Sequence, residues 1–291
     1  MKAIIESMRP HQWIKNFFIF AALIFSQNIF NLSLVIKSVI AFCAFCLISS
    51  SLYVFNDLKD VEEDKLHPLK SKRPLASGRL KKSSAILLII ILSLLGFSSA
   101  VSLNRNFFAI VLVYFLLQMA YSIRLKHVVI LDVFVIAAGF LIRVAAGGLA
   151  IEVSLSSWLL ICTILLALFL ALSKRRHELI LLEDSASEHR PILEEYNPYL
   201  LDQMIAVVTA STVIAYCLYT ISEETVIKFG TTKLIYTVPF VLYGIFRYLY
   251  LIHQKSEGGS PESLIIKDRP LLIDIFLWIL SAFIVLYFGA K

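Results

Sequence analysis

Nine long apolar runs are the feature that most restricts how this chain can fold. Several are long enough to cross a bilayer as a helix, which takes about 20 residues, and the others come close once their flanks are added. Lipid offers the backbone no hydrogen-bond partner, and the runs lack the short alternation of barrel strands, so helices are predicted. We therefore expect an all-α, polytopic membrane protein with about nine transmembrane helices in a single domain, residues 1–291. The runs cover residues 19–30, 34–55, 85–101, 107–123, 130–150, 155–173, 200–221, 234–252 and 271–290.

Composition and charge support a membrane location. Hydrophobic residues make up 59% of the chain and charged residues 16%, whereas soluble domains average about 45–50% and about 25%. The net charge of +6 would suit a nucleic-acid-binding protein, but the basic residues crowd alternate loops, at 59–82, 124–126, 174–190 and 255–269. Because positive loops face the cytoplasm, we expect a cytoplasmic N-terminus, these four loops on the same side of the cell inner membrane, and no nucleic-acid partner. No apolar segment precedes a small-residue cleavage site, so no signal peptide is predicted, and no obligatory protein partner is expected.

Two of the four cysteines, Cys43 and Cys46, form a C-x-x-C within the second run. Such a pair can bind zinc or carry redox chemistry, but here it has neither a second pair nor a flanking histidine. We interpret both residues as buried apolar side chains.

An acidic motif ends the second run and carries the predicted chemistry. It reads Asn56-Asp57-Leu58-Lys59-Asp60-Val61-Glu62-Glu63-Asp64. If the helix continues past the membrane, Asp57, Asp60 and Asp64 share one face and repel one another. Mg²⁺ would relieve that repulsion, because it takes one or two carboxylates and completes its shell with water and substrate phosphate. The alternative is a solvated acidic patch that ends the span.

The segment that follows, from Lys65 to Gly78, is predicted to be an irregular and rigid loop, because it contains two prolines and a glycine. Lys72 and Arg73 could fold back over a metal-bound diphosphate as cationic clamps. The alternative is that these charges only set the topology of the chain.

The motif at 56–64, together with the His-Pro and the Arg-Pro-x-Ala-Ser-Gly that follow, closely resembles the UbiA superfamily of intramembrane prenyltransferases. The resemblance implies a nine-helix bundle around a central cavity, with Mg²⁺ held on a diphosphate by the first aspartate motif. The family's second motif resembles Lys-Asp-x-x-Asp-x-x-x-Asp. This chain has Lys174-Arg175-Arg176-His177-Glu178 in its place, which favours direct phosphate binding by cations over a second metal cluster.

On these points the chain is most similar to the polyprenyl-phosphate phosphoribosyltransferase branch, which serves arabinan synthesis in the cell envelope. The similarity runs nearly end to end. It includes Arg9-Pro10-x-Gln12-Trp13-x-Lys15-Asn16, Tyr121-Ser122-x-x-Leu125-Lys126-His127, Leu141-Ile142-Arg143-Val144-x-Ala146-Gly147-Gly148 and Pro261-Glu262 with Asp268-Arg269-x-Leu271.

This branch implies transfer of 5-phosphoribose from phosphoribosyl diphosphate to a polyprenyl phosphate, with release of pyrophosphate. Asp57, Asp60 and Asp64 would then be the catalytic residues and the Mg²⁺ ligands. The residues predicted to bind substrate are Asn56, Lys15, Lys72, Arg73, Tyr121, Lys126, Asp132, Arg143, Lys174, Arg175, Arg176 and Glu178.

Several of these residues keep a structural alternative. Arg143 lies within the fifth run, eleven residues after Asp132, so the two side chains point the same way. They would form one polar wall or an internal ion pair that ties helices together. Arg9, Lys15, Tyr121 and Lys126 would contact phosphate or only anchor the membrane interface.

Two other functions compete with phosphoribosyl transfer. The first is prenylation of an aromatic acceptor by an enzyme of the same fold, which the intact first motif permits and the cationic second motif disfavours. The second is transport, because Asp132 and Arg143 could mark an ion path. The concentration of carboxylates at one membrane face argues against transport.

Overall fold

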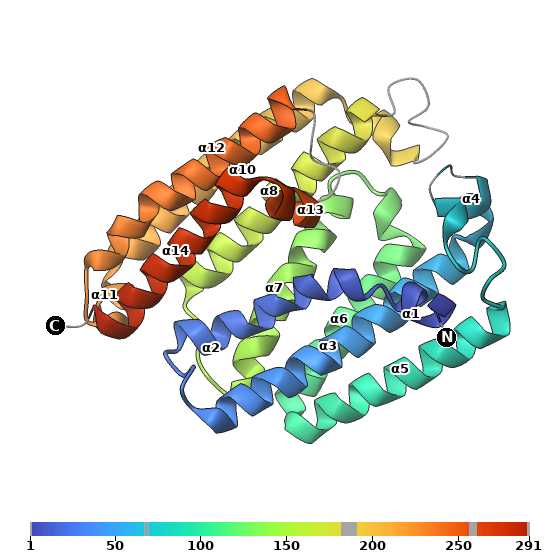
Figure 1. Cartoon of the computed structure of the whole chain (residues 1–291), viewed down its shortest axis with the longest axis horizontal. Coiled ribbons are helices and arrows are strands. Elements are labelled where there is room, and N and C mark those ends of the chain that lie inside the picture. Colours follow the sequence, from blue (N-terminus) through green and yellow to red (C-terminus); the bar gives the residue numbers. More distant parts are fainter. Residues whose placement is uncertain (1, 67, 69, 182–190, 256–260, 290–291) are drawn as a thin grey trace. The chain divides into compact units, whose positions relative to one another are not determined.

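The computed structural model describes residues 2–66, 68, 70–181, 191–255 and 261–289, and the regular structure of these residues is entirely helical (Figure 1). Two compact units share the chain. The first unit comprises Met1–Val128 and Gly139–Ser154, and the second comprises Val129–Ala138 and Leu155–Lys291. Helix α7 (Leu131–Ile151) therefore begins in the second unit and ends in the first.

Eight helices of the described residues are long and apolar enough to cross a membrane, which confirms the predicted all-α membrane fold. The central cavity implied by the family stays a prediction, as does the single domain. The spans lie at Leu32–Lys59, Lys82–Leu103, Arg105–Ile123, Leu131–Ile151, Ser157–Ile180, Pro198–Ile221, Lys233–Gln254 and Arg269–Phe288.

The first apolar run differs from the other eight. Together with its N-terminal flank, this run of residues 19–30 forms the 3₁₀ helix η1 (Pro10–Phe20, 11 residues), the short α-helix α2 (Ala21–Phe25, 5 residues) and the turn that follows, rather than one long α-helix. A 3₁₀ helix rises about 2.0 Å per residue against about 1.5 Å in an α-helix, so these segments together extend roughly 30 Å. The run therefore approaches the thickness of a bilayer core only together with its flank of residues 10–18, which includes Lys15 and Asn16.

In the first unit, the long helix α3 (Leu32–Lys59) packs along α5 (Lys82–Leu103) and α6 (Arg105–Ile123). Gly96 permits the close approach of α5, because a Cβ there would meet the Ile48 side chain at 2.7 Å. Toward α6, the ring of Phe45 packs against that of Tyr114 at 5.1 Å. Cys46 is buried as predicted, but the same prediction for Cys43 is wrong, because Cys43 is exposed. It lies in the apolar part of α3, which has lipid beside it.

Helix α7 carries the second close contact of the first unit. A Cβ at Gly147 would meet the carbonyl oxygen of Ile19 at 2.1 Å, so only glycine lets η1 lie this close. The polar part of the same contact is Arg143, which is 5% exposed and donates to Asn16 Oδ1 at 2.8 Å and Tyr114 Oη at 2.7 Å. These bonds join η1, α6 and α7 within the apolar interior.

In the second unit, α8 (Ser157–Leu181) packs along α10 (Pro198–Ile221), and α12 (Val238–Gln254) packs along α14 (Arg269–Phe288). The core between them includes Leu172, Leu201 and Leu251, each less than 5% exposed. Short elements connect the spans, namely η4 (Pro191–Glu195), α11 (Glu223–Phe229) and α13 (Pro261–Lys267), and η5 (Lys233–Thr237) begins the span that α12 continues.

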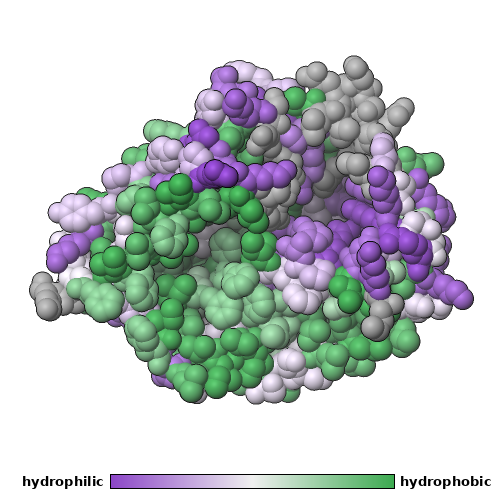
Figure 2. Space-filling view, viewed as in Figure 1, coloured by the Kyte–Doolittle hydropathy of each residue, from purple (hydrophilic) through white to green (hydrophobic). Residues whose placement is uncertain are grey.

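The outer surface of the spans is apolar. Along α5, Leu87, Leu94 and Val101 are 57%, 63% and 62% exposed. Figure 2 shows hydrophilic side chains gathered at the right of the view, over α1 (Lys2–Met8) and α4 (Val61–Leu66), and hydrophobic side chains below, along α5. An apolar surface of this extent on a folded protein marks contact with lipid or a partner, and the length of the helices identifies lipid.

Candidate functional site

The acidic motif lies where α3 gives way to α4. Helix α3 ends at Lys59, Asp60 follows as its C-cap, and α4 begins at Val61. The backbone stays helical through the junction, because Asp60 N–H donates to the Asn56 carbonyl at 2.9 Å and Asp64 N–H to the Asp60 carbonyl at 2.8 Å. The helical backbone thus continues past the span as expected, but the three aspartates do not share one set of partners.

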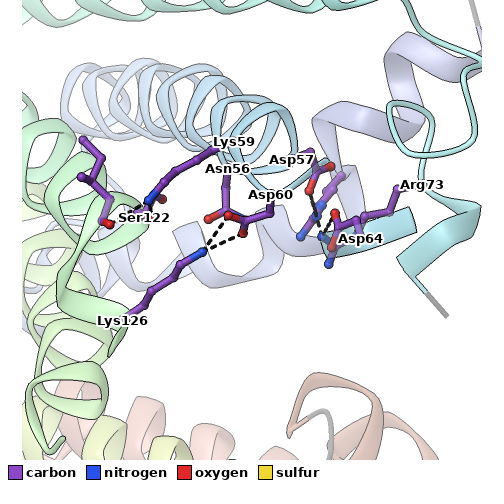
Figure 3. Close-up of polar contacts among 10 residues, drawn as sticks. Asn56, Asp57, Lys59, Asp60, Asp64, Arg73, Ser122 and Lys126 are labelled. Atoms are coloured by element: carbon purple, nitrogen blue, oxygen red, sulfur yellow. Dashed lines mark hydrogen bonds and ion pairs between the residues drawn. The ribbon is translucent and has the colours of Figure 1, made fainter. Parts of the chain in front are cut away.

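Asp57 and Asp64 form a pair held by Arg73 (Figure 3). Its Nη1 lies 3.1 Å from Asp57 Oδ1 and 2.6 Å from Asp64 Oδ2. Arg9 Nη2 makes a very short contact with the same Asp57 oxygen. Both carboxylates are almost fully buried, at 2% and 3% exposed. Burial makes a carboxylate costly unless it is paired, and the two guanidinium groups supply that pairing.

Asp60 points away from this pair, toward Lys126. The Lys126 Nζ lies 2.7 Å from Asp60 Oδ1 and 2.8 Å from Oδ2, and Asn56 Nδ2 donates to Oδ2 at 3.0 Å. Lys59 donates to the backbone carbonyls of Ser122 and Ile123 at 2.6 and 2.7 Å, at the end of α6 (Figure 3). These bonds hold the Lys126 segment, η3 (Leu125–His127), against the end of α3.

The site is strongly cationic around its carboxylates, and this affects His127. Its partial burial, followed by the neighbouring Lys126 and Lys59, lowers the pKa of the His127 imidazole below its usual value. The ring is therefore neutral near pH 7 and adds no positive charge there.

The donor set fits Mg²⁺. Among the residues that the structure describes, no group of three or more His, Cys, Asp or Glu side chains lies close enough to hold a metal by itself. Mg²⁺ does not need one, because it typically binds one or two carboxylates and fills its shell with water and substrate phosphate. The paired carboxylates of Asp57 and Asp64 meet that requirement, whereas Asp60 stands apart from them with Lys126.

In the second unit, the cationic motif lies on α8, and its central residue, Arg175, is paired with two carboxylates. Arg175 is 2% exposed. Its Nη2 lies 2.7 Å from Asp132 Oδ2 and its Nη1 lies 2.5 Å from Glu178 Oε2. Because both ends of the guanidinium contact carboxylates, Arg175 joins α8 to the first turn of α7.

Tyr196 completes this buried cluster. Its hydroxyl donates to Asp132 Oδ1 at 2.8 Å and accepts from the Ile130 backbone N–H at 2.7 Å. Burial raises the pKa of the Tyr196 hydroxyl to about 12, so it stays protonated and able to donate. Nothing in the sequence around Tyr196 indicated this contact, because its partner lies 64 residues earlier.

The residues of α8 on either side of Arg175 have different partners and exposure. Arg176 Nε lies 2.5 Å from Asp202 Oδ1, and His253 Nε2 lies 3.3 Å from the same oxygen. Lys174 and Glu178 are each partly exposed on α8. Lys174 is therefore more accessible to a soluble phosphate than Arg175 is.

Asp132 and Arg143 have separate partners. Asp132 pairs with Arg175 in the second unit, and Arg143 donates to Asn16, Tyr114 and the Gly139 carbonyl in the first. The predicted internal ion pair therefore forms between Asp132 and Arg175 rather than between Asp132 and Arg143. The guanidinium of Arg143 also lies over the Tyr114 ring at 4.8 Å, which suits a cation in an apolar interior.

The remaining predicted residues lie in the first unit. Lys15 is in η1, Tyr121 is in the last turns of α6 and both are partly exposed, whereas Lys72 is exposed in η2 (Lys70–Lys72). His67, from the His-Pro of the motif, lies outside the described residues. Arg9 is also a residue of the acidic site, although no local pattern indicates Asp57 as its partner.

Long lipid-facing helices, with a buried acidic site at the end of one span, define an integral-membrane protein. Residues 16–280 match the model of the UbiA prenyltransferase family, so the chain belongs to that family and is a membrane transferase.

Relatives and solved structures agree with this family. The chain is 33% identical to the decaprenyl-phosphate phosphoribosyltransferase of Mycolicibacterium smegmatis, over 99% of this chain and 94% of that protein. It is 31% identical to the decaprenyl-phosphate phosphoribosyltransferase of Corynebacterium glutamicum, over 98% and 86%. Its fold is similar to that of a UbiA homolog from Archaeoglobus fulgidus bound to GPP and Mg²⁺, with a TM-score of 0.75, 21% identity and coverage of 98% and 99%.

Proposed function

We propose that this protein transfers 5-phosphoribose from phosphoribosyl diphosphate to a polyprenyl phosphate and releases pyrophosphate. The observation that carries the proposal is similarity along nearly the whole chain to relatives named decaprenyl-phosphate phosphoribosyltransferase. The cationic sequence Lys174-Arg175-Arg176 on α8 supports it, because a donor with a 5-phosphate and an acceptor with a phosphate both require positive charge.

The reaction needs little covalent help from the protein. An oxygen of the lipid phosphate attacks C1 of the ribose, the bond from C1 to the diphosphate oxygen breaks, and pyrophosphate leaves with the electron pair. A phosphate is already anionic near neutral pH, so positioning and neutralisation of charge supply the rate. Mg²⁺, when bound, supplies positive charge for the departing pyrophosphate.

The acidic site would hold the donor. Asp57 and Asp64 would be the metal ligands, with Asp60 beside them as the third catalytic carboxylate. Arg73 and Lys126 already lie against these carboxylates, at 2.6 Å from Asp64 and 2.7 Å from Asp60. They would contact the diphosphate directly, as charge-assisted donors.

The charge distribution supports a cytoplasmic site in the inner membrane. The acidic motif, η3 and the basic end of α8 all lie in or beside loops rich in Lys and Arg, and such loops face the cytoplasm. The N-terminus would be on the same side, where a soluble phosphosugar is available. The two units would act as a single transferase domain.

The test is a transfer assay in detergent. Phosphoribosyl diphosphate labelled in the ribose is offered with a polyprenyl phosphate and Mg²⁺, and label in the organic phase is counted. Label that depends on both Mg²⁺ and the lipid phosphate is the expected result. Absence of label, together with transfer of a prenyl group from a prenyl diphosphate to an aromatic acceptor, would overturn the proposal in favour of the other activity of this fold.

A further inference from the structure

Three carboxylates of the acidic site are already matched by three cations of the chain. Asp57 contacts Arg9 and Arg73, Asp64 contacts Arg73, and Asp60 contacts Lys126. The cations come from three separate segments, namely the residue after α1, the loop after η2, and η3. Counted by these formal charges, the site as it stands carries no excess negative charge to attract a free divalent cation.

Arg9 is held in place by several independent contacts. Its backbone is left-handed, with φ 53° and ψ 61°, which is uncommon for any residue other than glycine. The carbonyl of the preceding Met8 accepts from Ser50 Oγ at 2.9 Å, and Trp13 Nε1 donates to the same hydroxyl at 2.9 Å. Strained backbone that persists in a native structure clusters at functional sites.

The side chain of Arg9 also lies against α3. The guanidinium lies 5.3 Å from the centre of the Tyr53 ring, on α3 one turn before Asp57. Helix α1, which precedes Arg9, is tied to the loop that carries Arg73, because Arg79 donates to both oxygens of Glu6 at 2.7 and 2.8 Å. Arg9 and Arg73 therefore approach Asp57 from two segments that are themselves connected.

The Oδ1 atom of Asp57 is the position at which a metal ion and the two arginines would compete. Asp57 Oδ1 contacts both Arg9 Nη2 and Arg73 Nη1, and a metal ion that binds this oxygen must displace a guanidinium group. Displacing an arginine from its carboxylate is unfavourable unless another anion is present to pair with it. A diphosphate is such an anion, because its oxygens can accept from the guanidinium in the same fork geometry. Arg9 has room to make that exchange, because its side chain is 22% exposed.

We propose that Arg9 is a diphosphate-binding residue that serves as the counter-ion of Asp57 before substrate arrives, so that the metal binds together with the diphosphate rather than first. This inference rests on the metal site of the proposed function. It predicts positive coupling between metal and diphosphate, which each ligand exerts equally on the other.

The test measures Mn²⁺ binding, with the metal as an electron paramagnetic resonance probe and inorganic pyrophosphate as the anion. Wild type is compared with Arg9→Gln and with Lys81→Gln. Lys81 is the control because it is exposed, follows the same loop and precedes α5 without a place in the site. Thermal unfolding in detergent establishes that each variant is folded.

Wild type and Lys81→Gln should bind Mn²⁺ weakly alone and at least tenfold more tightly with pyrophosphate. Arg9→Gln should bind Mn²⁺ alone about tenfold more tightly than wild type and gain less from pyrophosphate. Arg9→Lys keeps the charge but loses the planar fork, and should lie between the two. This variant keeps the test decisive if Arg9→Gln does not fold.

Two results would contradict the inference. The first would leave the proposed function intact, and the second would also contradict its metal site. If wild type gains Mn²⁺ affinity with pyrophosphate but the Arg9 variants bind Mn²⁺ alone no more tightly than wild type, Arg9 is not the counter-ion and the proposed function stands. If no form of the protein binds Mn²⁺ under either condition, the metal site of the proposed function fails as well.

Discussion

The acidic site of the first unit and the buried cluster of the second unit use the same side-chain types in opposite ways. At the acidic site, the carboxylates are buried and their cations are partly exposed, at 22% for Arg9 and 26% for Arg73. In the second unit the cation is buried too, since Arg175 is 3% exposed and Asp132 is 0% exposed.

The difference separates exchangeable pairing from permanent pairing. A guanidinium that solvent can reach can leave its carboxylate for another anion at modest cost. A charge pair withdrawn from solvent cannot, because an unpaired buried charge is strongly unfavourable. The first site is therefore suited to ligand exchange, and the second fixes α7 against α8. This comparison gives four predictions.

The largest effect is expected at the acidic site. Asp57→Asn and Asp60→Asn should each lower kcat by about 10²–10³-fold, because each removes a charge on which the transfer depends. Their thermal stability in detergent should change little. Glu63→Gln, an exposed neighbour on α4, is the matched control and should keep its activity. Retained turnover of the two Asp variants at saturating Mg²⁺ would remove them from the site.

The second effect is on stability and concerns the buried cluster. Asp132→Leu should lower the free energy of unfolding by about 3–5 kcal/mol, because it leaves Arg175 without its buried partner. The double variant with Arg175→Met should recover much of that loss, since an apolar pair can replace a buried ion pair. Denaturant unfolding of both single variants and the double variant measures the coupling. Additive losses would show that the two side chains do not depend on each other.

A smaller effect is expected at Lys126. Lys126→Gln should lower kcat/KM about tenfold, or about 1.4 kcal/mol, because Asp60 keeps its negative charge but loses the cation that both of its oxygens contact. Lys65→Gln is the control, because it removes a charge from α4, where Lys65 contacts the exposed Glu62 at 2.8 Å. Equal losses in the two variants would assign the effect to surface charge in general.

The smallest effect is a pH dependence outside the spans. The hydrogen bonds from Arg79 hold the pKa of Glu6 below its usual 4.5. A carboxyl with a lowered pKa stabilises the fold above its unfolded pKa, and that contribution is lost as pH falls through the folded value. The melting temperature of wild type should therefore exceed that of Glu6→Gln slightly at neutral pH and converge with it below about pH 4. A difference in melting temperature that stays constant across this pH range would show that titration of Glu6 does not cause it.

Much of the fold and one side of the site could be predicted from the sequence. The apolar runs and the spacing of Asp57, Asp60 and Asp64 are local patterns, and local patterns follow from helix geometry. The 3₁₀ form of η1 was not predictable in the same way, because its close contact with Gly147 depends on a helix more than 120 residues later.

The partners of the charged residues were beyond sequence reasoning. Arg9 and Lys126 both read as basic residues near membrane ends, where such charges also set topology. Their contacts with Asp57 and Asp60 span 48 and 66 residues. Arg175 likewise read as a phosphate ligand. Helix spacing allows its contact with Glu178, three residues later, but its contact with Asp132, on another helix, has no local signal.

The bond between Arg143 and Asn16 has a consequence for biosynthesis. The two residues are 127 positions apart, and at a typical synthesis rate of about 5–20 residues per second the later one follows on the order of ten seconds after the first. During that interval the amide of Asn16 has no access to its later partner, although polar groups are costly in lipid. The N-terminal segment is therefore expected to settle late, when α7 has been made and its arginine can enter the membrane already paired.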